Sequence, residues 1–423
     1  MRRICLVVHR FGKEIVGGSE QLARCYAHLL KDDCAVHVVT TCAADYLTWK
    51  NEFPEGVSQE DGIYVHRFAV DFERTLYWHQ LHYSLLLRHI APGAPEQWPT
   101  LWFEDSKKDA FRRAVANLPR AVQEEFVRCQ GPYSSSLLRF LENEKDNFDV
   151  YVFFTYLYPT TYYGSQVVPR GKRILVPTLH DEPHARLPLF REMVEDFDKL
   201  IFLTPGERSI AERIWQPSVP GELVGLPVEL TSQNGGIAES IPECPYLLYC
   251  GRIESAKGAS ALFQQFIRYK AEHSSELKLV LTGHAAERIP DHPDILFLGY
   301  VDESRKFSLM RGAKVFVHPS ALESFSIVLL EAFLSGTPAL VNANSVVLAE
   351  HCRAANAGLE YRNYDEFAEC LSQLLSNSEI RKALGDNGRR YAQQNYSSEV
   401  ITTKLKALLE HRDWECRSQA ANV

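Results

Sequence analysis

Short apolar runs, each followed by a loop and a helical pattern, recur along this chain, and this alternation restricts its fold more than any other feature. The first repeat has an apolar run at 4–8, a loop with Gly12, Gly17 and Gly18, and a helical pattern at 20–30. Further buried strands are expected at 36–40, 151–154, 173–176 and 200–203. Strands that alternate with helices form mostly parallel sheets covered by helices, so the sequence predicts a doubly wound α/β fold.

The alternation stops between 219 and 245, where prolines and glycines break the periodicity, and we place the domain linker there. It then restarts, with strands expected at 246–250, 277–281 and 314–318 and a helix at 259–273. A length of 423 residues suggests two or three domains at about 150 residues each, and we predict two.

We therefore predict two doubly wound, Rossmann-like α/β domains. The predicted parts are an N-terminal domain at 1–225, a C-terminal domain at 226–396, and a last helix at 397–423 that crosses back to the N-terminal domain.

Residues 76–144 lack strand patterns and are interpreted as a helical insertion in the first domain. The insertion carries three tryptophans, Trp78, Trp98 and Trp102. We expect these aromatic side chains to pack the insertion onto the sheet. The alternative is a surface that faces a membrane or binds an acceptor, which the basic pairs at 107–108 and 112–113 would suit.

Composition excludes several classes of protein. The net charge of -8 argues against a nucleic-acid-binding surface, which needs clustered Lys and Arg. The ten cysteines include no CxxC pair and are expected to be reduced. The apolar start is too short for a signal peptide, and no run approaches the roughly 18 apolar residues of a spanning helix. We expect a cytoplasmic protein, with peripheral contact at the inner face of the membrane left open. The oligomeric state is not indicated.

The segment at 319–338 predicts a strand end, a loop, a helix and a helix stop at Gly336 and Pro338. Within the helix, Glu331 has apolar neighbours and no basic residue three or four positions away. A buried carboxylate without a partner is costly, so Glu331 should either face solvent or accept hydrogen bonds from a ligand. Glu323 precedes the helix, whose N-terminus favours phosphate. The plain alternative is a solvated pair of glutamates.

Two cations, Arg252 and Lys257, stand in a glycine-bounded turn after the first strand of the second domain. Open α/β sheets bind ligands at this end of their strands, and Arg with Lys can hold a diphosphate. The alternative is a solvated loop in which Lys257 pairs with Glu254.

Gly17 and Gly18 open the first helix. The segment lacks both the GxGxxG spacing of dinucleotide-binding enzymes and the GxxxxGK[ST] of P-loops, which argues against a dehydrogenase or an NTPase. Close approach to a phosphate or sugar is one interpretation. An ordinary tight turn with Ser19 as the helix cap is the other.

His180 and Asp181 follow a predicted strand and are candidates for substrate contact. A metal site is discounted, because the spacing matches no zinc pattern and Pro183 breaks helical presentation of the histidines. Asp196-Phe197-Asp198 has the form of a metal-binding DxD, but it directly precedes an apolar run and is interpreted as a surface turn entering a strand.

Together these segments resemble the retaining GT-B glycosyltransferases of family 4, also called glycosyltransferases group 1. The resemblance is strongest from 246 to about 375, where the sequence has the GR-x4-KG loop, the strand end at 281–283, the segment 297–301 and the E-x7-E element from Glu323 to Glu331. The first domain matches through Gly17-Gly18, the strand end at His180 and the segment 204–207.

The resemblance implies a GT-B fold in which an acceptor-side first domain and a donor-side second domain face a central cleft. It also implies a nucleotide-diphosphate sugar donor, a saccharide or lipid-linked saccharide acceptor, retention of configuration, and no cofactor or metal. Arg252 and Lys257 would hold the diphosphate, Glu331 the ribose hydroxyls and Glu323 the donor sugar, and His180 would lie beside the transferred sugar. The remaining implied donor-binding residues are Gly17, Gly18, Gly251, Gly283, Gly299, Tyr300, Val301, Ser324, Phe325 and Ser326.

Two features depart from the family's pattern. Ser326 follows Phe325 where Phe-Gly is commoner, and the Gly-Gly that often follows the next strand is absent from 342–346. The second departure concerns sugar-side or acceptor-side contacts more than nucleotide binding. UDP is favoured over GDP as the commoner donor base. A nucleotide-sugar epimerase and a non-catalytic nucleotide-sugar-binding protein are the alternatives.

Overall fold

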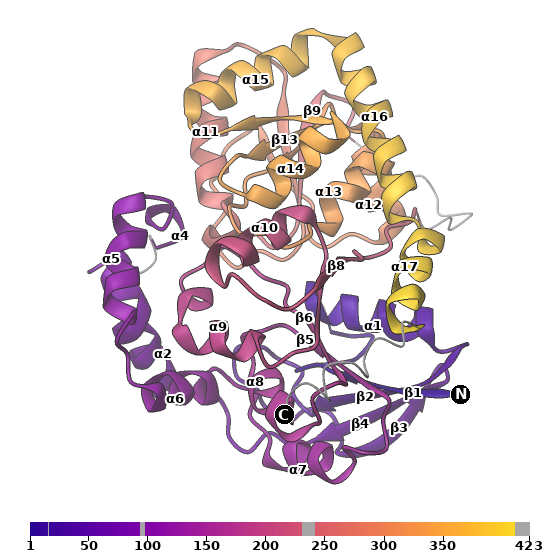
Figure 1. Cartoon of the computed structure of the whole chain (residues 1–423). Helices are drawn as coiled ribbons and strands as arrows, with labels where there is room; N and C mark the ends of the chain where they lie inside the picture. Colours follow the sequence, from indigo (N-terminus) through magenta and orange to yellow (C-terminus); the bar gives the residue numbers. More distant parts are fainter. Residues whose placement is uncertain (16, 94–97, 231–241, 411–423) are drawn as a thin grey trace. The chain divides into compact units, whose positions relative to one another are not determined.

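The computed structural model describes residues 1–15, 17–93, 98–230 and 242–410. The chain groups into two compact units, Met1–Leu226 together with the residues from Thr402 onward, and Pro227–Ile401. Figure 1 follows the chain through both units in sequence colours. Part of the predicted linker, at 231–241, and the predicted continuation of the last helix beyond 410 lie outside the described residues.

The first unit is built on an eight-stranded sheet in the order β3-β4-β2-β1-β5-β6-β7-β8. Its strands are β1 (Arg2–Val7), β2 (Cys34–Thr41), β3 (Gly56–Glu60), β4 (Ile63–Phe68), β5 (Val150–Phe154), β6 (Arg173–Val176), β7 (Lys199–Phe202) and β8 (Gly221–Leu223). Only β3 pairs antiparallel, with β4. The five strands predicted in this half are confirmed, because each is an apolar run buried in the sheet.

Parallel strands need helices to cover their sheet, and α1 (Gly18–Leu30), α8 (Pro159–Val167) and α10 (Pro205–Ile214) contact its strands. The unit also contains α9 (Pro188–Val194) and, from the end of the chain, the part of α17 (Ser398–Glu410) that begins at Thr402. The inner face of α1 buries Leu22, Tyr26 and Leu30. In α17, Lys406 forms an ion pair with Asp33 at 2.5 Å, which ties the end of the described chain to the first unit.

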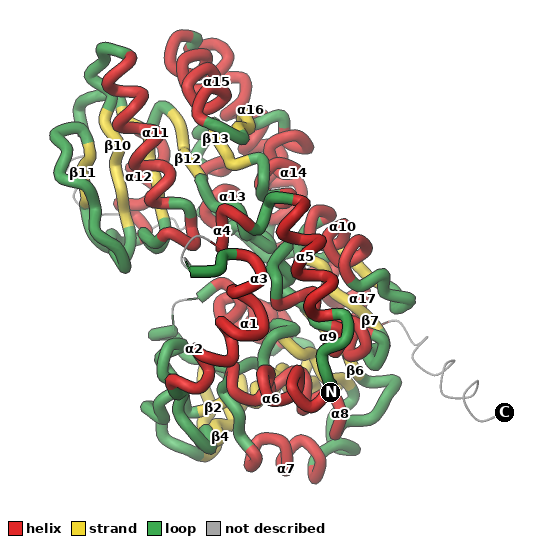
Figure 2. Tube along the Cα trace, turned by 90° about the vertical axis from the view of Figure 1, so that its left-hand side faces the viewer, coloured by secondary structure: helices red, strands yellow, loops and turns green. Residues whose placement is uncertain are grey.

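The described part of the segment predicted as an insertion consists of helices joined by loops and contains no strand, as Figure 2 shows. It contains α2 (Leu76–His82), a π-helical turn (Tyr83–Leu87), α3 (Arg88–Ile90), α4 (Trp98–Leu101), α5 (Asp105–Val115), α6 (Arg120–Gln130) and α7 (Ser135–Asn143). Trp102 is fully buried and donates its indole N–H to the Asp181 carbonyl at 2.7 Å. This packing agrees with the structural interpretation of the tryptophans, although Leu76 and Tyr77 on α2 remain exposed.

The second unit is built on a six-stranded, fully parallel sheet in the order β11-β10-β9-β12-β13-β14. Its strands are β9 (Tyr246–Cys250), β10 (Lys278–Thr282), β11 (Ile295–Phe297), β12 (Val315–His318), β13 (Ala339–Asn342) and β14 (Gly358–Tyr361). Its helices are α11 (Ala259–Glu272), α12 (Glu303–Gly312), α13 (Ile327–Leu334), α14 (Val346–Ala355), α15 (Tyr364–Ser376) and α16 (Ser378–Tyr396). The predicted strands and helix of this half are confirmed, and one contiguous core joins β9, β10 and β12 to α11 and α15.

The described cysteines are all free thiols. Among the described helices, none combines the length and the apolar character that crossing a bilayer requires.

Candidate functional site

Three loops of the second unit meet at the carboxyl edge of its sheet, because β10, β9 and β12 are neighbours. Glycines allow the loops to approach closely. Gly258 and Gly283 both have positive φ, of 79° and 125°, and a Cβ on either would overlap a backbone carbonyl oxygen, that of Pro319 or of Gly251. The sequence signals after β9, β10 and β12 therefore lie in one place.

Lys257 and Glu323 join two of these loops. The Lys257 ammonium lies 2.7 Å from a carboxylate oxygen of Glu323, and both side chains are mostly buried. The alternative pairing of Lys257 with Glu254 is wrong, since Glu254 instead faces Arg252 at 3.2 Å. The two residues to which the resemblance gives diphosphate and sugar contacts are thus already in contact with each other.

Glu331 is buried in α13, with 7% of its surface exposed. Burial raises the pKa of its carboxyl, and Lys306 opposes the rise. The Lys306 ammonium donates to Oε1 at 2.8 Å and also pairs with Glu303, whereas Oε2 of Glu331 is buried with no hydrogen-bond partner among the described residues.

This geometry corrects the sequence argument for Glu331, which allowed only solvent or a ligand as partners. Lys306 on α12 is a third kind of partner, and it binds one carboxylate oxygen of Glu331. Looking three or four positions along the helix cannot find Lys306, because it lies 25 positions from Glu331. The other oxygen still has the property that the sequence argument required, an acceptor that only an added donor would satisfy.

Ser326 is the N-cap of α13 and has φ of 65°, in the left-handed region that favours glycine. Its hydroxyl is buried without a partner among the described residues. Ser326, which stands where the family commonly has glycine, therefore keeps the backbone conformation that suits glycine.

The segment after β11 completes this edge. Gly299 accepts a hydrogen bond from the Gly283 N–H at 2.9 Å, which places it beside the loop after β10. Tyr300 is 81% exposed, and Val301 is half-buried. The exposed ring of Tyr300 therefore offers an aromatic surface on which a flat ring of a ligand could stack.

In the first unit, Gly17 is the N-cap of α1 in extended backbone, and a Cβ there would collide with the Glu20 carboxylate. A Cβ on Gly18 would meet nothing within 4 Å, so its surroundings are open. The interpretation of Ser19 as the helix cap is wrong, because Ser19 lies inside the first turn and donates its hydroxyl to Glu20 at 2.9 Å.

Glu20 is the residue in this region that the sequence analysis missed. Its Oε1 accepts from His9 Nε2 and Arg10 Nε, each at 2.9 Å, and from a second nitrogen of the same guanidinium. Burial works against ionisation, but His9 and Arg10 hold the pKa of Glu20 well below its ordinary range. His9 in turn stacks on Tyr158 with ring centres 3.8 Å apart.

His180 and Asp181 follow β6 and differ in their surroundings. Asp181 is buried and pairs with Arg186 at 2.6 Å, Arg213 at 2.7 Å and Lys108 at 3.4 Å, which makes it a structural centre. His180 is partly exposed, with Nδ1 3.8 Å from Glu182. Only His180 thus keeps a surface for a substrate.

The interpretation of Asp196-Phe197-Asp198 as a turn is confirmed. Asp198 accepts from the Arg173 N–H at 2.8 Å, Asp196 pairs with Arg170, and β7 begins at the next residue.

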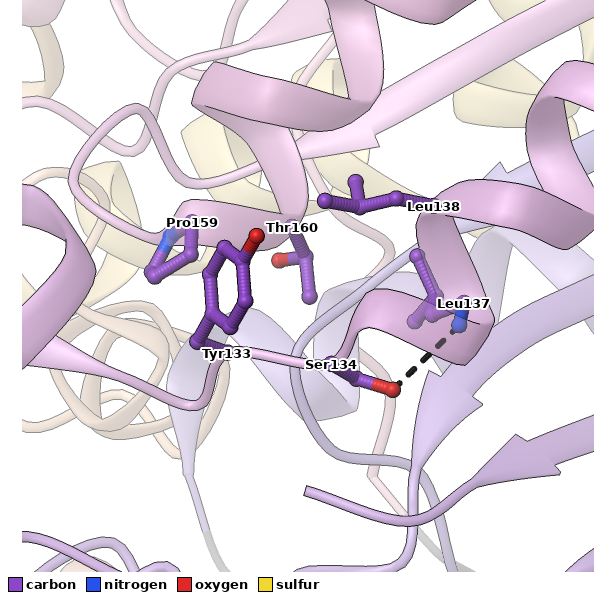
Figure 3. A pocket seen from close by; sticks show the side chains of 6 residues that line it. All are labelled: Tyr133, Ser134, Leu137, Leu138, Pro159 and Thr160. Carbon is purple, nitrogen blue, oxygen red and sulfur yellow. Dashed lines mark hydrogen bonds between the residues drawn. The ribbon is translucent and has the colours of Figure 1, made fainter. Parts of the chain in front are cut away.

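A small pocket lies elsewhere in the first unit, beside α7 and α8 (Figure 3). It is lined by Tyr133, Ser134, Leu137, Leu138, Pro159 and Thr160. None of these is a residue to which the sequence analysis gives a role, and Ser134 is occupied as the helix cap of α7.

Residues 237–391 match the family described as Glycosyl transferases group 1. The O-antigen chain mannosyltransferase B of Escherichia coli is 28% identical over 251 residues, which cover 54% of this chain and 65% of that protein. The chain spans about half the length of the curated relatives it matches.

Solved structures extend the similarity to the whole chain, at the level of the fold. The sucrose-phosphate synthase of Thermosynechococcus elongatus matches with a TM-score of 0.65 and 16% identity, over 100% of both chains. Anabaena HepE, solved in complex with UDP and glucose, matches with a TM-score of 0.61 and 13% identity, over 97% of this chain and 99% of that one.

Proposed function

Since the chain has the two Rossmann-like domains of the GT-B fold and a group 1 glycosyltransferase domain at residues 237–391, we propose that it transfers a sugar from a nucleotide-diphosphate donor to a saccharide or lipid-linked saccharide acceptor. The observation that carries the proposal is Oε2 of Glu331 at the carboxyl edge of the second sheet, which is buried and has no hydrogen-bond partner in the part of the chain that the structure describes. Two ribose hydroxyls are donors that would satisfy such an oxygen.

The diphosphate would bind Arg252 and Lys257 on the loop after β9, close to the N-terminus of α13. Lys257 is held by Glu323 in the free protein, so its ammonium is already oriented when the phosphates arrive. Glu323 would then accept from hydroxyls of the donor sugar, which makes the loop before α13 a contact for both halves of the donor.

The chemistry proposed is transfer with retention of configuration. The bond from the anomeric carbon to the phosphate oxygen breaks, and its electron pair leaves with the nucleoside diphosphate. The acceptor hydroxyl attacks the same face, its oxygen bonds to the anomeric carbon, and its proton passes to the leaving phosphate. Arg252 and Lys257 stabilise the negative charge that develops on that phosphate, so no protein nucleophile is required.

UDP is the favoured donor base, which the UDP complex of the similar HepE fold supports, and GDP is the second choice. The names of relatives such as the O-antigen mannosyltransferase support an acceptor in polysaccharide or glycoconjugate synthesis. We propose that Arg252 and Lys257, and no divalent metal ion, balance the charge of the donor diphosphate. Donor binding should therefore persist when EDTA is added.

A thermal-shift panel of UDP-, GDP-, ADP- and dTDP-sugars tests the donor assignment. A ligand present at about 100 times its Kd stabilises the folded protein by about 2.7 kcal/mol, so one base should stand out. A panel without any shift would contradict the proposal. Turnover of the selected donor should need an added acceptor, and turnover without one would point to hydrolysis or epimerisation instead.

Arg252→Ala should lower kcat by about 100-fold or more, because it removes a cation from the leaving phosphate. Arg268→Ala is the matched control, since Arg268 is an exposed arginine of the same unit paired with Glu272 on α11. Equal rates for the two variants would remove Arg252 from the site.

A further inference from the structure

His351 is a buried histidine on α14 that contacts the loop before α13. Its Nε2 lies 3.1 Å from the Phe325 carbonyl oxygen, and its Nδ1 lies 3.1 Å from the Tyr391 hydroxyl on α16. No sequence motif singles it out, and the reaction proposed above does not use it.

The partners of the ring determine where its proton lies. A carbonyl oxygen only accepts, so Nε2 must carry the hydrogen. Burial lowers the pKa of His351 to about 4, so the ring is neutral near pH 7 and Nδ1 accepts from the Tyr391 hydroxyl. The Tyr391 oxygen can then accept from Tyr396, 3.4 Å away. A directed chain of hydrogen bonds runs from Tyr396 through Tyr391 and His351 to the Phe325 carbonyl.

This chain acts on the peptide unit that joins Phe325 to Ser326. Because the C=O and N–H of a trans peptide point in opposite directions, a carbonyl held toward His351 turns the Ser326 N–H away from it, at the start of α13. Ser326 has φ of 65°, which a serine rarely adopts. Rotating the peptide unit to bring Ser326 to negative φ would swing the carbonyl off His351.

The helix α16 thereby restrains α13 at both ends. At the far end, Arg389 donates to the Leu334 and Ser335 carbonyls at 3.1 and 3.2 Å. At the near end, Tyr391 acts through His351. Figure 1 shows α16 beside α13 and α14, and α16 contacts both of these helices.

We propose that His351 is a positioning residue for the donor site: its hydrogen bond to the Phe325 carbonyl fixes the peptide unit before α13 so that the Ser326 N–H is presented to the donor diphosphate. The inference rests on the proposed function, and it adds a residue that touches no substrate.

Titration calorimetry of the full chain with UDP and with GDP tests the inference. His351→Leu removes the donor and should weaken binding of the preferred nucleotide by about 10-fold, the value of one hydrogen bond of about 1.4 kcal/mol. His351→Gln keeps an N–H near the position of Nε2 and should recover binding to within about 3-fold of wild type. Tyr391→Phe removes the hydroxyl that donates to Nδ1 of His351, and it should weaken nucleotide binding less than His351→Leu does.

Tyr269→Phe is the matched control, because it removes another buried tyrosine hydroxyl bond of the same unit, to Ser372, and should bind like wild type. The Gln and Phe variants keep the test valid if the Leu variant fails to fold. A folded Leu variant with wild-type affinity, or a Gln variant no better than Leu, would overturn the inference and leave the donor assignment standing. A wild-type chain that binds neither nucleotide would instead overturn the donor assignment, and the inference with it.

Discussion

Glu20 in the first unit and Glu331 in the second are both buried carboxylates near the sheet edge of their unit, and they differ in what surrounds them. Glu20 has His9, Arg10 and Ser19 as hydrogen-bond partners, and these hold its pKa well below the ordinary range against the effect of burial. Glu331 has Lys306 on one oxygen and no described partner on the other, and burial raises its pKa.

The difference separates a structural carboxylate from one prepared for a ligand. A fully satisfied buried ion stabilises the fold around it, and its loss leaves Arg10 without a counter-charge. A buried carboxylate with one unpaired oxygen, such as Glu331, destabilises the free protein. A ligand that donates hydrogen bonds to that oxygen removes this cost, and the gain adds to its binding free energy. Substitution of each residue should therefore change a different measured quantity.

Glu20→Gln should give the largest effect, a loss of about 3 kcal/mol in the free energy of unfolding, because the Arg10 guanidinium stays buried without its anion. Urea denaturation measures the change. Glu192→Gln, at an exposed glutamate of the same unit paired with Arg120, should stay within about 0.5 kcal/mol of wild type.

The pH dependence provides a second check on Glu20. A carboxyl with a lowered folded pKa contributes its full stability above its ordinary pKa of 4.5 and loses it as the pH falls through the folded value. The stability difference between wild type and Glu20→Gln should be constant from neutral pH down to 4.5 and narrow below it. A difference that widens on acidification would contradict the assignment.

Glu331→Gln should change binding instead of stability. Nucleotide-sugar affinity should fall about 10- to 100-fold, since hydrogen bonds to a charged acceptor contribute about 1.5–3 kcal/mol. Stability should change by less than about 1 kcal/mol, because Lys306 keeps Glu303 as a partner. Calorimetry with the donor found in the thermal-shift panel measures the affinity.

Glu303→Gln is the matched control for this variant, since it removes the other, 53% exposed partner of Lys306 and should leave affinity unchanged. If both variants weaken binding equally, the free oxygen of Glu331 is not what holds the donor.

The predictable strands were the central ones of each sheet, β1, β2, β5, β6 and β7 in the first and β9, β10 and β12 in the second, because each contains a continuous apolar run. The parallel strands β4, β8, β11 and β14 were not predicted. The strand β3 was missed since its residues are exposed on both faces, with Val57 66% exposed, so it has no alternating pattern. The π-helical turn at Tyr83–Leu87 likewise has no sequence signature that separates it from an α-helix.

The candidate site was predictable to the extent that it follows strand ends. The resemblance gave Arg252, Lys257 and Glu323 contacts with one donor, and the Lys257–Glu323 pair agrees with this. The two loops meet because adjacent parallel strands end at the same edge of the sheet. Lys306 and His351 were not predictable, because each acts on a residue of another element, 25 and 26 positions away, and neither stands in a motif.

Ser326→Gly tests whether the donor loop of the second unit stores backbone strain, and it should give the smallest effect. Glycine adopts φ of 65° freely, whereas serine there costs about 1–2 kcal/mol, and the added flexibility of glycine in the unfolded chain returns part of that gain. The variant should therefore be about 0.5 kcal/mol more stable by urea denaturation.

Ser345→Gly is the control, since Ser345 caps α14 at φ of -82° and its loss should destabilise the protein by a few tenths of a kcal/mol. If Ser326→Gly were as destabilising as this control, the left-handed turn would hold no strain, and the contrast with the fully satisfied Glu20 region would rest on Glu331 alone.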